Sequence, residues 1–94
     1  MPELPNQKPT IEEEVESISD IASRVILFND DWHTFDEVIA QLIKAINCSF
    51  EQARALAFEV HVKGKAIVFS GTMPECLRVS SVLEEIALHT QIIT

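Results

Sequence analysis

Glycine and basic residues are scarce in this sequence, and both shortages exclude classes of function. The two glycines, Gly64 and Gly71, cannot build a glycine-rich phosphate loop or a dinucleotide-binding turn, which excludes an ATP-driven enzyme. Seven Lys and Arg stand against fifteen Asp and Glu, for a net charge of −8. Because nucleic-acid binding needs a basic face, no nucleic-acid partner is expected.

Cysteines and long apolar runs are also few. Cys48 and Cys76 have no metal-ligand spacing, so we expect free thiols and neither a metal nor another cofactor. The longest apolar runs, Val25 to Phe28 and Ala66 to Phe69, are far shorter than the ~20 residues that a membrane span needs. The first residues lack the basic and then apolar pattern of a signal peptide. We therefore expect a soluble cytoplasmic protein without a membrane partner, in the simplest case a monomer.

Acidic residues and proline are concentrated at the N-terminal end. Residues 1–23 hold six acidic side chains against Lys8 alone, together with Pro2, Pro5 and Pro9. Proline removes backbone donors and like charges repel one another, so we expect residues 1–22 to form a mobile acidic tail. Residues 23–94 are then one small core domain, which is large enough to fold without metal or disulfide support.

Hydrophobic periodicity predicts three helices and three strands in this core. Apolar residues spaced three and four apart, each run opened by a capping box, predict helices after Thr34, Ser49 and Thr72. The second helix ends at Gly64, and the third carries its apolar stripe as far as Ala87. Short β-branched and aromatic runs predict strands over 24–28, 65–70 and 90–93. The order β-α-α-β-α-β predicts an α+β sandwich, with three helices packed on one face of a small three-stranded antiparallel sheet.

Polar residues gather at the ends of two predicted elements. Asn29, Asp30 and Asp31 follow the first strand, and His61 lies near the end of the second helix. Taken alone, the three loop residues are typical of an ordinary turn before a helix, and His61 of a histidine satisfied by backbone or water. A small hydrolase using these groups as acid and base is not favoured, because no nucleophile, metal site or oxyanion-hole motif accompanies them. We expect no enzymatic activity.

Two segments of the sequence carry a family resemblance. The run VILFNDDWHTFDEVIAQLI, followed by VHVKGKA from Val60 to Ala66, resembles the ClpS family, adaptors that select N-degron substrates for a Clp-type AAA+ protease. The resemblance covers roughly Arg24 to Ile93 and agrees with the predicted order of elements. It implies a ClpS-like adaptor core that binds proteins with a bulky hydrophobic N-terminal residue (Leu, Phe, Tyr or Trp). The implied partner is the N-terminal domain of a ClpA-like or ClpC-like unfoldase, which receives the substrate for degradation.

The resemblance also implies a binding site with two parts. Asn29, Asp31 and His61 hold the α-amino group of the substrate, and Asp30 assists through its backbone or by shaping the loop. Three acceptors suit an ammonium group, which has three donors and no acceptor. The substrate's first side chain enters an apolar pocket, with His33 near its rim. The implied pocket residues are His33, Phe35, Val38, Ala57, Val60 and Ile92, or Ile93 in its place.

Other interpretations of the same residues stay open. Helical periodicity alone also places Phe35, Val38 and Val60 in an ordinary core. Phe35 stands where many family members have methionine, and Ala57 stands where a longer side chain is common, so the selectivity of the pocket is undetermined. The second candidate function is a non-catalytic protein-interaction domain without amine recognition, similar to the C-terminal domain of the ribosomal stalk protein, which shares this type of sandwich.

Overall fold

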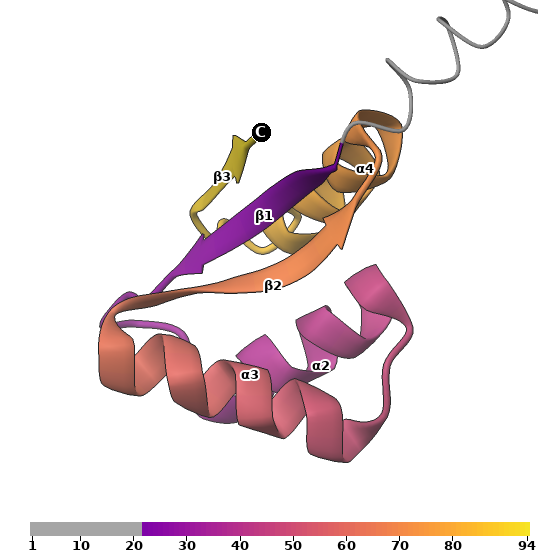
Figure 1. The fold of residues 1–94 in the computed structure, drawn as a ribbon. Helices are drawn as coiled ribbons and strands as arrows, with labels where there is room; N and C mark the ends of the chain where they lie inside the picture. Colours follow the sequence, from indigo (N-terminus) through magenta and orange to yellow (C-terminus); the bar gives the residue numbers. More distant parts are fainter. Residues whose placement is uncertain (1–21) are drawn as a thin grey trace, which may run out of the picture.

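The computed structural model describes residues 22–94 and contains three helices and three strands (Figure 1). The predicted acidic tail, residues 1–22, lies outside the described residues except for Ala22. The predicted α+β class and the order β-α-α-β-α-β are confirmed. In chain order the elements are β1 (Ser23–Phe28), α2 (Phe35–Ile46), α3 (Phe50–Lys63), β2 (Lys65–Gly71), α4 (Met73–Glu84) and β3 (Thr90–Ile93).

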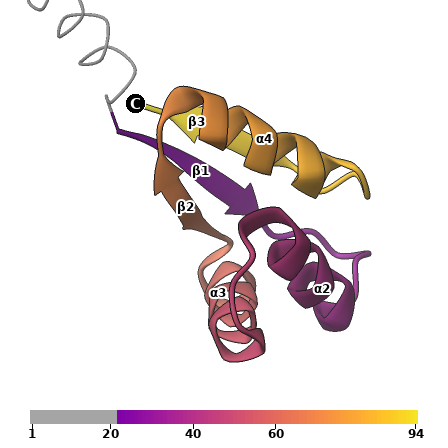
Figure 2. The ribbon, with the colours of Figure 1, turned by 90° about the vertical axis from the view of Figure 1, so that its right-hand side faces the viewer.

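The sheet is antiparallel in the order β2-β1-β3, so β1 is its central strand. Along β1, Ser23, Val25 and Leu27 are buried while the residues between them are half-buried. This alternation is expected where helices cover one face of a sheet and the other face meets solvent. On the covered side α4 contacts all three strands, α2 packs against α4 and α3, and α3 packs against β2. Figure 2 shows α4 alongside the strands and α2 and α3 near the end of β1.

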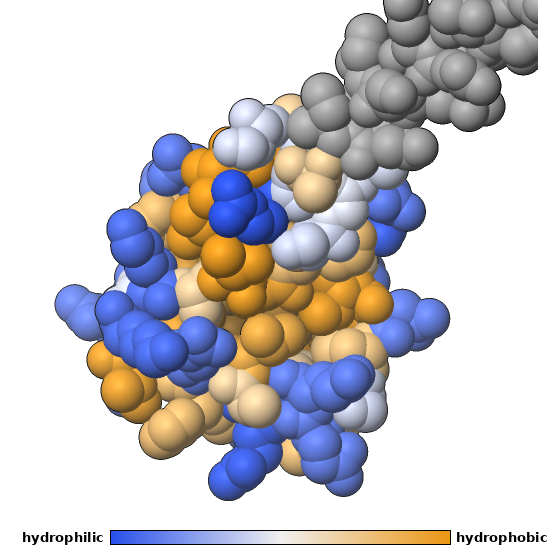
Figure 3. All heavy atoms as spheres, in the orientation of Figure 1, coloured by the Kyte–Doolittle hydropathy of each residue, from blue (hydrophilic) through white to orange (hydrophobic). Residues whose placement is uncertain are grey.

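The uncovered face of the sheet is largely apolar. The register places Ile26 opposite Ile67 and Phe28 opposite Lys65 on this face, and Ile67 is 45% exposed. The Lys65 ammonium lies 5.8 Å from the centre of the Phe28 ring. Figure 3 shows apolar surface across the middle of this face, over the strands. We refer to this surface as the open sheet face.

The core lies between the sheet, α2 and α4. Leu27, Leu42 and Leu83 are its largest fully buried side chains and come from β1, α2 and α4. Burying one such side chain contributes roughly 1.5–3 kcal/mol, so these contacts fix how the two helices lie on the strand. Both cysteines are free thiols, and Cys76 is buried in this core. No helix within residues 22–94 is long and apolar enough to cross a membrane.

The end of α4 differs from the sequence-based expectation. The predicted apolar stripe ran on to Ala87, but the helix ends at Glu84. Ala87 has a φ of 66°, a left-handed conformation that an α-helix cannot contain, and its N–H donates to the Glu84 carbonyl at 2.9 Å. The resulting turn reverses the chain so that β3 can pair with β1. It also leaves Leu88 buried just before β3.

Gly64 ends α3 and connects this helix to the loop after β1. Its φ of 87° is left-handed, and its N–H donates to the Val60 carbonyl at 2.9 Å. The Gly64 carbonyl in turn accepts a hydrogen bond of 2.9 Å from the Asn29 N–H. The glycine therefore fixes the end of α3, which carries His61, beside the first residue of the loop.

The substitution Gly64→Ala should lower the free energy of unfolding by about 1–2 kcal/mol, because a left-handed φ is strained for a residue with a Cβ. No atom lies within 4 Å of the added methyl group, so the cost is conformational and not steric. Urea denaturation measures the change. The control is Val62→Ala at a side chain that is 60% exposed, where a change within about 0.5 kcal/mol is expected. Equal losses in the two variants would contradict this role of Gly64.

Candidate functional site

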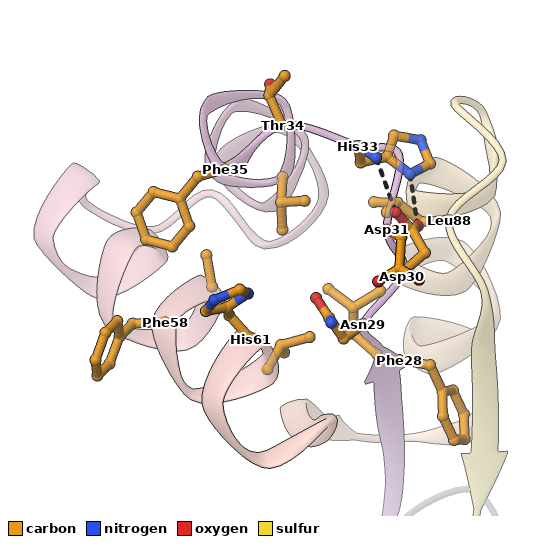
Figure 4. A pocket seen from close by; sticks show the side chains of 14 residues that line it. Phe28, Asn29, Asp30, Asp31, His33, Thr34, Phe35, Phe58, His61 and Leu88 are labelled. Carbon is orange, nitrogen blue, oxygen red and sulfur yellow. Dashed lines mark hydrogen bonds and ion pairs between the residues drawn. The ribbon is translucent and has the colours of Figure 1, made fainter.

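A cavity of about 520 Å³ opens where β1 ends (Figure 4). It lies between the loop formed by residues 29–33, the start of α2, the second half of α3 and the turn before β3. The described residues that line it are Leu27, Phe28, Asn29, Asp30, Asp31, His33, Thr34, Phe35, Val38, Ala57, Phe58, Val60, His61 and Leu88.

The inner wall of the cavity is apolar. Ala57, Val60 and Leu88 are buried, and they come from α3 and from the turn before β3. The helices stay in place because α2 and α3 each begin at a complete capping box and are held against the core. Ala57 presents only a methyl group at a buried position of this wall.

The outer wall is polar. Asn29, Asp31 and His61 are all exposed and all line the cavity. In Figure 4 the side chains of Asn29 and His61 face each other across the cavity, and Asp31 lies on the Asn29 side. Within residues 22–94, no hydrogen bond or ion pair engages these three side chains. Their acceptor atoms are therefore available to a ligand.

Asp30 has a different part in the loop. Its Oδ1 accepts hydrogen bonds from the N–H groups of Trp32 and His33, at 3.1 and 2.8 Å. Its Oδ2 lies 2.6 Å from Nδ1 of His33. Burial raises the pKa of the Asp30 carboxyl group, but these hydrogen bonds from His33 and Trp32 outweigh burial and hold the pKa below 3.8. The carboxylate thus closes the loop on itself, which agrees with a loop-shaping role.

His33 lies deeper than the rim position implied by the family resemblance. Its side chain lines the cavity but is only 4% exposed. The reason is that both ring nitrogens have partners inside the protein: Nδ1 meets Asp30, and Nε2 lies 2.6 Å from the carbonyl oxygen of Ile86. Burial lowers the pKa of His33, but its hydrogen bonds to Asp30 and to the Ile86 carbonyl outweigh burial and raise the pKa above 6.5.

Four of the remaining implied pocket residues line the cavity, namely Phe35, Val38, Ala57 and Val60. Ile92 does not, and this expectation is wrong. In β3, Ile92 pairs with Val25 and Ile93 pairs with Arg24, near the start of β1, whereas the cavity lies at the end of β1. Leu88 provides the wall on that side instead, because the turn at Ala87 brings it there before β3 begins.

Phe58 and Leu88 also line the cavity, and neither was predicted from the sequence to do so. Phe58 is 60% exposed on α3 and lines the cavity beside Ala57. Its position in the sequence could have indicated this role, because Phe58 is an aromatic residue on the polar side of an amphipathic helix and lies three residues before His61. Leu88 gave no such signal, because its position depends on where α4 ends. Figure 4 shows Phe58 and Phe35 on the side of the cavity away from Asp30 and His33.

The sequence of this chain is similar to a known protein family and to several individual proteins. The model of the family described as ATP-dependent Clp protease adaptor protein ClpS matches residues 19–91. The ClpS adapter protein of Treponema denticola is 51% identical over 45 residues, which are 48% of this chain and 45% of that protein. The E3 ubiquitin-protein ligase UBR1 of Drosophila melanogaster is 31% identical over 70 residues, which are 73% of this chain and 4% of the ligase. The chain thus spans less than half the length of each of these relatives.

A solved structure shares the fold. Agrobacterium tumefaciens ClpS2, determined with L-phenylalaninamide bound, superposes with a TM-score of 0.66 at 19% sequence identity. The match covers 76% of this chain and 93% of that one. Together with the family match over most of the sequence, this shows that the chain belongs to the ClpS family.

Proposed function

We propose that this protein is a non-enzymatic adaptor that binds other proteins by a bulky hydrophobic N-terminal residue and delivers them to a Clp-type unfoldase-protease for degradation. The observation that carries the proposal is the composition of one cavity. Asn29, Asp31 and His61 offer unengaged acceptors at its outer wall, and Ala57, Val60 and Leu88 make its inner wall apolar. A free amino terminus followed by an apolar side chain requires both features.

The polar wall fits an ammonium group. An ammonium group has three donors, and an Asn carbonyl, an Asp carboxylate and a neutral His nitrogen supply three acceptors. Such charge-assisted hydrogen bonds contribute about 1.5–3 kcal/mol each. No Lys or Arg is among the described residues that line the cavity, while Asp30 and Asp31 are. The local charge therefore favours a cation.

The apolar wall fits the first side chain of the substrate. Burying a Leu or Phe side chain contributes roughly 1.5–3 kcal/mol, which together with the ammonium contacts supports binding near micromolar strength, about −8 kcal/mol. The small Ala57 widens the cavity for aromatic side chains, and Phe35, 39% exposed, borders it. The ligand of the Agrobacterium protein, L-phenylalaninamide, has the same two features, a free amine and an apolar side chain.

Delivery requires a second surface that docks on an unfoldase, and the N-terminal domain of a ClpA-like or ClpC-like protein is the proposed partner. On α4, the charged side chains of Glu75 and Arg78 both have contacts within the protein. Glu75 completes the capping box with Thr72, and Arg78 donates to the Ala45 carbonyl at 3.0 Å. A plain interaction domain like that of the ribosomal stalk is less well supported, because it has no need for three unengaged acceptors around an apolar cavity.

N-acetylation of the ligand tests the amine requirement. A short peptide that begins with Phe should bind with roughly micromolar affinity, and its N-acetylated form should bind at least about 100-fold more weakly because the cation is gone. Fluorescence anisotropy of labelled peptides measures both affinities. A peptide beginning with Gly is the control for the apolar pocket. Equal binding of the free and acetylated peptides would overturn the proposed function.

Removal of one acceptor tests the polar wall. His61→Ala should weaken binding of the Phe-starting peptide by about 1–3 kcal/mol, since one partner of the ammonium group is lost. His61 is exposed, so the free energy of unfolding should change little. The matched control is His89→Ala, a histidine that is exposed and lies outside the cavity lining. Calorimetric titration that found the same affinity for His61→Ala and the unsubstituted protein would remove His61 from the site.

Deletion of the acidic N-terminal residues separates binding from delivery. A version consisting of residues 23–94 should keep its affinity for the Phe-starting peptide, because every residue of the proposed site lies within it. We further propose that residues 1–22 act when the substrate is passed to the unfoldase, so degradation of an N-degron substrate by an unfoldase-protease should slow in this version. The two assays are peptide binding and loss of a fluorescent substrate. Loss of peptide binding on deletion would show that the proposed domain boundary is wrong.

A further inference from the structure

Both ring nitrogens of His33 lie against oxygen atoms that accept hydrogen bonds. Nδ1 is 2.6 Å from Oδ2 of Asp30, and Nε2 is 2.6 Å from the Ile86 carbonyl oxygen. A carbonyl oxygen has no proton to give. The Asp30 carboxylate accepts two backbone N–H groups at its other oxygen, which favours its ionised form. Both partners are satisfied at once only when both nitrogens of His33 donate, so these contacts favour the imidazolium form of the ring.

Trp32 covers this cation. The centres of the Trp32 and His33 rings lie 3.9 Å apart with an interplanar angle of 32°. The indole is 67% exposed, while the His33 side chain beneath it is 4% exposed. A cation on the face of an indole ring gains a favourable electrostatic contact, and burial strengthens it. Trp32, although largely exposed, therefore shields the buried ring of His33 from solvent.

The contacts of His33 connect two walls of the cavity. The loop at 29–33 carries Asn29 and Asp31, and Ile86 lies in the turn after α4, 53 residues further along the chain. Two residues after Ile86, Leu88 forms part of the apolar wall. Figure 4 shows His33 above Asp30, with Leu88 close by. His33 is thus a side-chain link between the amine acceptors and the apolar wall, beside the hydrogen bond of 3.0 Å from the Phe28 N–H to the His89 carbonyl.

We propose that His33 is a positioning residue of the peptide pocket, which as an imidazolium ties the acceptor loop to the turn at Ile86. Its deprotonation as the pH rises then loosens the loop and weakens binding of the N-terminal residue. The inference rests on the proposed function and adds a means of regulating the same site. His33 lines the cavity, but both of its ring nitrogens are engaged by the loop and the turn, so we expect it to act on a ligand mainly through the positions of Asn29 and Asp31.

Charged groups around His33 support the cation. Asp30 is its direct partner, Asp31 lies in the same loop, and Glu37 on α2 also favours the charged ring. At the end of α4, Glu84 accepts hydrogen bonds from the hydroxyl groups of Ser80 and Thr90, and Glu85, the residue after the helix, pairs with Lys44 at 2.9 Å. His89, the other titratable group there, stacks on Phe28 with ring centres 4.8 Å apart.

The direction of the pH effect follows from these contacts. The raised pKa of His33 means that its stabilising contribution is complete below 6.5, the ordinary value of a histidine, and is lost as the pH rises through the raised value. The lowered pKa of Asp30 means that its contribution is complete above 3.8 and is lost only as the pH falls through the lowered value. The tie between loop and turn is therefore complete below pH 6.5 and is lost at some point as the pH rises above it.

The first part of the test uses the free protein. Trp32 is the only tryptophan of the chain, and an imidazolium in contact with an indole quenches its fluorescence. Emission should rise in one step as the pH increases, with a midpoint above 6.5. His33→Gln should abolish the step, Asp30→Asn should move it to lower pH, and the matched control His89→Gln should leave it unchanged. A step that is missing, that lies below 6.5 or that persists in His33→Gln would overturn the proposal.

The second part measures the affinity for a Phe-starting peptide from pH 6 to 10. The peptide's own α-amino group titrates near pH 8, but it does so equally for every variant, so the ratio of affinities isolates His33. At pH 6, below the fluorescence step, the unsubstituted protein should bind about tenfold more tightly than His33→Gln, and the ratio should approach one as the step is completed. A ratio independent of pH would overturn the positioning role. If the fluorescence step is present but the unsubstituted protein does not bind the peptide at pH 7, the proposed function is overturned. The result for the charge of His33 would still stand.

Discussion

The pocket depends on the hydrogen bond between the Asn29 N–H and the Gly64 carbonyl, at 2.9 Å. This bond joins the end of β1 to the end of α3, two points that are far apart in the chain. Each end carries part of the polar wall, Asn29 and Asp31 on one side and His61 on the other. Acceptors can converge on one small cation only if the elements that carry them are fixed to each other. A left-handed glycine at the helix end allows this, because it turns the carbonyl outward without strain.

The neighbouring residues Asp30 and Asp31 have different positions and contacts in the loop. Asp30 uses both of its oxygen atoms to accept hydrogen bonds from the loop itself, and Asp31 remains exposed at the cavity. A loop that is closed by its own side chain needs no ligand to order it, so less conformational entropy is lost on binding. The same arrangement places a carboxylate that holds the loop next to an exposed carboxylate that faces the cavity.

The fold could be predicted from the sequence because the sequence patterns that mark its helix ends are local. Capping boxes at Thr34, Ser49 and Thr72 and the glycine after α3 lie within a few residues of the helix ends that they define. The pocket was accessible only in part. Phe35, Val38, Ala57 and Val60 lie on helices of regular geometry, so their direction follows from the helical period.

The errors concern residues whose positions depend on contacts distant in sequence. Leu88 replaces Ile92 in the wall because a left-handed alanine ends the run that periodicity predicted as helix. His33 is buried because a carbonyl 53 residues away accepts from its ring. Neither a backbone conformation at Ala87 nor a tertiary hydrogen bond of this kind can be read from the spacing of apolar residues.

The open sheet face also bears on how copies of this protein behave together in solution. Ile67, 45% exposed, and its neighbour Ile26 present apolar surface that would be removed from water if two such faces met. A net charge of −8 makes every encounter between copies repulsive over distances of about one Debye length, ~8 Å at physiological salt. The net negative charge thus opposes contact between two open sheet faces, and concentrated salt weakens this repulsion.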